Sequence, residues 1–116
     1  MINDSPLYDH LIDAARAGKT LTYKEIASIL QLDVTKLEDR KQIDHLLLDI
    51  ACRENAEGRP LLSMLVVQPE IGYPWKSIFL LAREIGANNC CDERSFFSYE
   101  LKRVHQYWKE RARTYH

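Results

Sequence analysis

The stretch Thr22-Tyr23-Lys24-Glu25-Ile26-Ala27 decides the fold, because it marks where a helix begins and which of its faces is buried. Thr22 and Glu25 have the spacing of a capping box, in which each side chain accepts a hydrogen bond from the backbone amide of the other residue. The apolar positions that follow recur with the helical period of 3.6 residues: Tyr23, Ile26, Ala27 and Leu30. The stretch therefore predicts a short amphipathic helix that ends near Leu32 and Asp33 and depends on tertiary packing for its stability.

Helices are also predicted on both sides of this stretch. Residues 5–18 form an amphipathic pattern with Pro6 at its start and Gly18 at its end, and residues 19–23 read as a brief extended link. A second possible capping box, Thr35 with Glu38, begins a longer helix that ends at residues 57–58, although Asp39 is an alternative cap. The first half of the chain thus predicts three helices joined by short links.

The second half of the chain begins with a continuous apolar run, LLSMLVV at residues 61–67. A run of this length with β-branched residues at its end predicts one buried strand. Residues 68–74 have the Pro and Gly content of a turn, and a helix follows from Pro74 to Ile85, with Gly86 beyond its end. After a polar loop at 87–91, Asp92 caps a last helix that carries Phe97, Leu101, Val104 and Trp108 along one stripe.

Length and composition predict one globular domain over residues 1–116. The chain has 46% hydrophobic and 28% charged residues and a formal net charge of −1, so any basic surface for nucleic acid must be local. No apolar run approaches the roughly 18 residues of a membrane span, and the first residues lack a cationic segment followed by an apolar one. Three cysteines, an odd number, argue against a secreted disulfide framework. These features predict a cytoplasmic protein without a membrane partner.

The order of these elements resembles a winged helix-turn-helix. The predicted fold class is accordingly mostly α (α+β): a winged-helix-like helix bundle with a small β element and two added C-terminal helices. More narrowly, residues 22–27 are similar to the Thr-Tyr-x-Glu-Ile-Ala stretch in the DNA-binding part of alkylguanine-DNA alkyltransferases and their alkyltransferase-like relatives. The resemblance covers about residues 19–74.

The resemblance implies DNA binding but not the chemistry of the transferases. It places Tyr23 beside the DNA backbone and Arg40 or Lys41 in the space of a flipped base. The reactive Pro-Cys-His-Arg motif of the family is expected at residues 60–67, where this chain reads PLLSMLVV, so alkyl transfer to cysteine is excluded. The resemblance also puts Asp44 where the family has a small residue, which adds a negative charge on the DNA side.

The residues offer no catalytic, metal or cofactor constellation. Cys90 and Cys91 are adjacent and lack the spacing that lets two thiolates bind one zinc ion, and Cys52 reads as a buried, inert thiol. The histidines form no zinc-binding motif, and no glycine-rich phosphate loop occurs. We therefore predict a binding protein and not an enzyme, and an enzyme that uses these cysteines is the least favoured class.

The leading hypothesis is a helix-turn-helix that binds DNA. Duplex affinity comes mainly from phosphate neutralisation, yet residues 33–59 carry five basic and seven acidic side chains, a local charge of −2. Only a narrow strip is left to contact phosphates, and we assign it to Tyr23, Lys24, Arg40, Lys41 and Lys76.

The alternative is a protein-interaction module, such as an inhibitor, immunity or adaptor protein, that meets a basic partner through the acidic third helix. Its predicted contact residues are Asp44, Asp49, Tyr73 and Trp75. The segment Tyr73-Pro74-Trp75-Lys76 suits a recognition loop or a hydrophobic plug at a helix start, and the sequence leaves both open. The last helix has a local basic excess of two, which is typical of a solvated surface.

Overall fold

The computed structural model describes residues 5–89 and 91–114, with side chains for residues 6–89 and 91–111. Within these residues the chain is mostly helical with a small β element, as predicted. The elements are α1 (Ser5–Arg16), β1 (Leu21–Thr22), α2 (Tyr23–Leu30), α3 (Leu37–Ala56), the 3₁₀ helix η1 (Leu62–Leu65), β2 (Val66–Val67), α4 (Lys76–Glu84) and α5 (Glu93–Thr114).

The capping box predicted before α2 is present. The Thr22 hydroxyl accepts from the Glu25 amide at 3.2 Å, and the Glu25 carboxylate accepts from the Thr22 amide at 3.3 Å. α2 ends at Leu30, slightly before the predicted end, and Gln31 closes it in the left-handed conformation. At the start of α5, the Asp92 carboxylate accepts from the Ser95 amide at 2.8 Å, which confirms the predicted cap.

The second predicted capping box is wrong. Thr35 donates from both its amide and its hydroxyl to the Asp33 carboxylate, at 2.9 and 2.7 Å, so its side chain closes a turn and does not cap the helix. α3 begins at Leu37 after Lys36, which makes no side-chain cap. The Asp39 carboxylate accepts from the Asp33 amide at 2.8 Å, and this bond ties the connection to the first turn of α3.

The strand predicted over residues 61–67 is mostly wrong in conformation and right in burial. All seven residues are buried, but Leu62–Leu65 form η1 and only Val66–Val67 form a strand. A strand presents its side chains to two faces only, whereas η1 contacts α1, α3 and α5 together. The tighter helical turn therefore lets one short segment pack against three helices.

The β element is a parallel pair. β1 lies beside β2, with Leu21 opposite Val66 and Thr22 opposite Val67. α2 and α3 lie between them in the sequence and form the crossover that a parallel connection requires. The extended link predicted at residues 19–23 is thus one edge of this pair.

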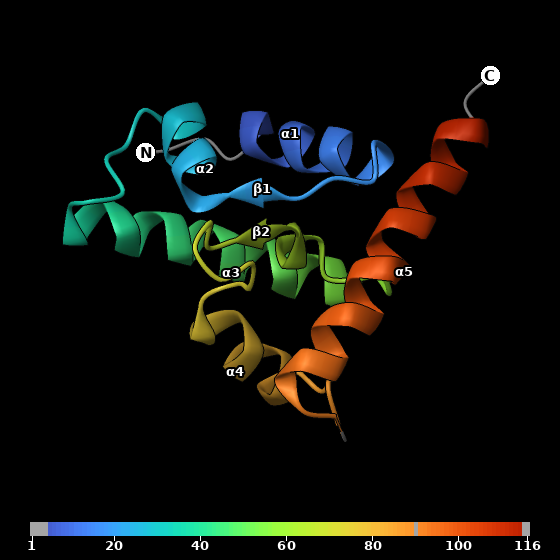
Figure 1. Cartoon of the computed structure of the whole chain (residues 1–116). Helices are drawn as coiled ribbons and strands as arrows, with labels where there is room; N and C mark the ends of the chain where they lie inside the picture. Colours follow the sequence, from blue (N-terminus) through green and yellow to red (C-terminus); the bar gives the residue numbers. More distant parts are fainter. Residues whose placement is uncertain (1–4, 90, 115–116) are drawn as a thin grey trace.

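Two apolar clusters lie side by side and share helices. The first is built from α1, α2, α3, η1, β2 and the second half of α5, and the second from α3, α4, Leu61, Met64 and the first half of α5. Figure 1 shows α5 running along one end of the molecule, from beside α4 to beside the end of α1. No helix in the described ranges has both the length and the apolar character needed to cross a bilayer.

Candidate interaction surface

The predicted contact residues Tyr23 and Trp75 form one stack. Tyr23 is the first residue of α2 and is 4% exposed, and its ring lies 3.7 Å from the Trp75 ring with an interplanar angle of 9°. The Trp75 backbone amide donates to the Tyr23 hydroxyl at 2.7 Å. The start of α2 is thereby fastened to the segment that leads into α4, 52 residues away in the sequence.

Arg40 adds a cation to this stack. Its guanidinium carbon lies 5.3 Å from the centre of the Trp75 ring, within the range of a cation–π contact. Arg40 is exposed and lies in the second turn of α3, whereas Trp75 is half-buried. We call Tyr23, Trp75 and Arg40 the aromatic stack, and its members come from α2, α3 and the segment before α4.

The Tyr23 hydroxyl is held in its neutral form. Burial raises its pKa above the ordinary value of a tyrosine, and the negative charge of Asp44 adds to this effect. The hydrogen bond from the Trp75 amide lowers the pKa; its influence is smaller than that of burial and larger than that of Asp44. Tyr23 is therefore a buried acceptor that positions Trp75, and its ring does not lie at the surface.

The other predicted residues differ in their partners. The Asp44 carboxylate accepts from the Ser77 hydroxyl at 2.5 Å and so faces α4. Lys76 forms an ion pair with Glu93, and Lys41 lies 3.8 Å from Glu38 one turn away on α3. Lys24 and Asp49 are exposed on α2 and α3.

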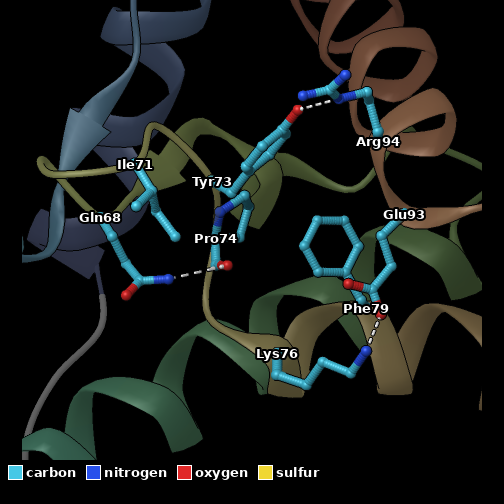
Figure 2. Close-up of a pocket in the computed structure, with 8 residues that line it drawn as sticks. All are labelled: Gln68, Ile71, Tyr73, Pro74, Lys76, Phe79, Glu93 and Arg94. Atoms are coloured by element: carbon cyan, nitrogen blue, oxygen red, sulfur yellow. Dashed lines mark hydrogen bonds and ion pairs between the residues drawn. The ribbon is translucent and has the colours of Figure 1, made fainter.

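A shallow hollow of about 370 Å³ lies between the 68–74 turn and the starts of α4 and α5. Figure 2 shows its lining residues, which are Gln68, Ile71, Tyr73, Pro74, Lys76, Phe79, Glu93 and Arg94. Tyr73 accepts from the Arg94 guanidinium at 3.0 Å, and its ring meets Phe97 edge-to-face at 5.1 Å. Gln68 donates to the Pro74 carbonyl at 3.4 Å. The wall of the hollow is thus held in place by contacts between the 68–74 turn and α5.

The structure therefore divides the nine predicted residues into groups. Tyr23, Arg40 and Trp75 form the aromatic stack, while Tyr73 and Lys76 line the hollow. Asp44 lies beside α4, and Lys24, Lys41 and Asp49 lie at the surface without joining either group. Sequence reasoning missed the stacking of Tyr23 on Trp75, because no local pattern relates residues that lie so far apart in the chain.

The cysteines require one correction. Cys52 is exposed on α3, so the prediction of a buried thiol is wrong. The apolar stripe of α3 passes through Ala51 and Leu47 and leaves Cys52 on the outer side of the helix. Cys91 is half-buried, and Cys90 lies outside the described residues. In the ranges 5–89 and 91–114, no three side chains of His, Cys, Asp or Glu are grouped as metal ligands.

No protein-family model, no curated protein and no solved structure matches this chain.

Proposed function

We propose that this protein binds nucleic acid through the surface around the aromatic stack, without catalysing a reaction. The observation that carries the proposal is the guanidinium of Arg40 lying over the half-buried ring of Trp75. Nucleic-acid-binding surfaces combine cations that meet phosphates with aromatic rings on which bases stack. The resemblance of residues 22–27 to a DNA-binding stretch supports the same proposal, as does the succession of two helices, α2 and α3, joined by a short connection.

The acidic side chains near the stack weaken the electrostatic attraction but do not abolish it. Asp33, Asp39 and Asp44 each accept a hydrogen bond within the fold. These hydrogen bonds partly offset the three negative charges, while Arg40, Lys41 and Lys24 are exposed. We therefore expect modest affinity with a shallow salt dependence at this surface.

The variant Arg40→Gln tests the proposal. It removes the charge over Trp75, so binding of a fluorescent DNA duplex at low salt weakens about tenfold, as measured by fluorescence anisotropy. Arg53→Gln is a matched control, because Arg53 is also exposed on α3 and lies 5.9 Å from the ring of Tyr8. Equal binding by Arg40→Gln and the unaltered protein would contradict the proposal.

A second candidate function is docking of a basic protein. Ile71, at the rim of the hollow, is 62% exposed, and exposed apolar side chains beside polar ones are common where proteins dock. Asp49 on α3 supplies a negative charge for such a partner. Affinity capture tests this candidate. A protein captured by the unaltered chain and by Glu57→Lys, but not by Asp49→Lys with Ile71→Asp, favours it. Capture by both variants removes it.

We propose a cytoplasmic location, because the chain has three cysteines and an odd number argues against a secreted disulfide framework.

A further inference from the structure

A second basic surface lies on α5, away from the aromatic stack. Lys102, His105 and Lys109 recur at helical spacing and occupy one face of α5. The loop after α1 packs against this face, because the Lys19 carbonyl oxygen lies 3.1 Å from His105 Nε2. We call Lys19, Lys102, His105 and Lys109 the α5 basic face.

Lys109 lies beside the end of α1. Its ammonium lies against Gly18, so close that a β-carbon at Gly18 would be 3.0 Å from Lys109 Nζ. Gly18 has a φ of +71°, and this left-handed turn lets the chain pass beneath the lysine. The Lys109 ammonium thus lies over the end of α1.

The lysines of this face are not neutralised by carboxylates. Among the residues that the structure describes, Lys19, Lys102 and Lys109 have no carboxylate oxygen within 4.0 Å, and all three are exposed. Glu110 follows Lys109 on α5, and its carboxylate accepts from Gln106 at 3.2 Å. Lys41 and Lys76 of the predicted strip differ, because each has an acidic partner.

The shape and spacing of the face suit a phosphate backbone. A hollow of about 370 Å³ is lined by Lys102, His105, Gln106, Lys109 and Glu110. Lys102 and Lys109 are two helical turns apart, a rise of roughly 10 Å. Two exposed lysines at this spacing can each contact a separate phosphate of one strand.

We infer that the α5 basic face binds the phosphate backbone of nucleic acid without reading its sequence. The inference rests on the proposed function for the class of ligand, and it adds a contact that the aromatic stack does not supply. Nucleic acid is favoured over a membrane surface because the exposed aliphatic side chains Leu37, Ile71 and Leu80 lie on other elements. The exposed aromatic residue of α5, Tyr99, has the Arg103 guanidinium over its ring. A face without exposed aliphatic side chains gains affinity from counterion release, which is characteristic of phosphate contacts.

The variant Lys102→Gln with Lys109→Gln tests the inference. Removing two phosphate contacts lowers the slope of log affinity against log salt by about 2 and weakens duplex binding at low salt more than tenfold. Arg53→Gln with Arg83→Gln removes the same charge from α3 and α4 and leaves the slope unchanged. Far-ultraviolet circular dichroism verifies that each variant is folded.

The outcomes separate this inference from the proposed function. Unchanged salt dependence in the double lysine variant overturns the α5 basic face alone. Loss of binding in that variant, with Arg40→Gln unaffected, supports the α5 basic face and overturns the role of the aromatic stack. If the unaltered protein binds phosphatidylserine vesicles but no duplex, both proposals are overturned.

Discussion

Among the described residues other than glycine, Gln31 alone has a left-handed backbone, with a φ of 59° and a ψ of 41°. Its amide donates back to the carbonyls of Ala27 and Ser28 and closes α2. The Cβ atom itself is costly in this conformation, so glycine is the usual residue there. The exposed position of Gln31 means that its side chain contributes little packing in return.

We therefore predict that Gln31→Gly stabilises the protein by about 0.5–1 kcal/mol, measured by urea unfolding. The control is Gln42→Gly, since Gln42 is exposed within α3 and glycine there costs about 1 kcal/mol. Destabilisation by both variants would show that the left-handed turn at Gln31 carries no strain.

At the scale of elements, Tyr8 of α1 is joined to α3 by a buried carboxylate. The Tyr8 hydroxyl donates to Glu54 at 2.8 Å, and Arg59 donates to the same carboxylate from two nitrogens at 2.8 and 3.1 Å. Glu54 is 1% exposed, so its charge is stable there because both partners satisfy it. The network also holds the end of α3 to the chain that leads into η1.

The Tyr8 hydroxyl makes this network sensitive to alkaline pH. Burial, together with the hydrogen bond to Glu54 and its negative charge, raises the pKa of Tyr8 from 10.0 to about 12. Between these values the unfolded chain releases the proton and the folded protein keeps it, so the free energy of unfolding falls as pH rises from 10 to 12.

We predict that Tyr8→Phe makes this alkaline loss shallower and costs about 1 kcal/mol at neutral pH, where a hydrogen bond to Glu54 is missing. Urea unfolding at a series of pH values measures both effects. Tyr99→Phe is the control, because Tyr99 is exposed and lies elsewhere on the surface. The raised pKa of the buried Tyr23 leaves part of the alkaline loss in place. Identical pH profiles for Tyr8→Phe and the unaltered protein would contradict the prediction.

The sequence predicted elements well where their signals were local. The pair Thr22 and Glu25 caps α2 as expected, and both hydrogen bonds of the box form. Thr35 has the same spacing to Glu38, but Asp33 is two residues earlier and takes both its amide and its hydroxyl. The Thr-x-x-Glu spacing alone does not reveal that a third residue, Asp33, competes for Thr35.

Burial was easier to predict than conformation in the 61–67 run. Seven apolar or small residues in succession predict an interior segment whichever backbone it adopts. The choice of η1 over a longer strand depends on α1, α3 and α5 surrounding the segment, and that arrangement is tertiary. The candidate site had the same limit, since Tyr23 and Trp75 meet only after the chain has folded.

For the whole molecule, the arrangement of the cores makes unfolding cooperative. The two apolar clusters share α3 and α5, and the buried Glu100 carboxylate of α5 accepts from the Leu61 amide at 2.8 Å, between them. Opening one cluster therefore exposes part of the other. The two tryptophans report on different parts of the first cluster, because Trp75 lies against it in the aromatic stack and Trp108 lies within it on α5.

We predict that Trp75 and Trp108 report the same unfolding midpoint. Trp108→Phe leaves Trp75 as the fluorophore and removes no hydrogen bond, because the buried Trp108 indole nitrogen has no hydrogen-bond partner among the described residues. Its cost is that of a smaller ring in the core. Trp75→Phe leaves Trp108 and keeps an aromatic ring on Tyr23. In each variant, the fluorescence transition in urea coincides with the loss of helix measured by circular dichroism, as two-state unfolding requires. An earlier fluorescence transition for Trp108 would mean that the second half of α5 detaches before the α2–α3 region opens, and the first apolar cluster would then not unfold as one unit.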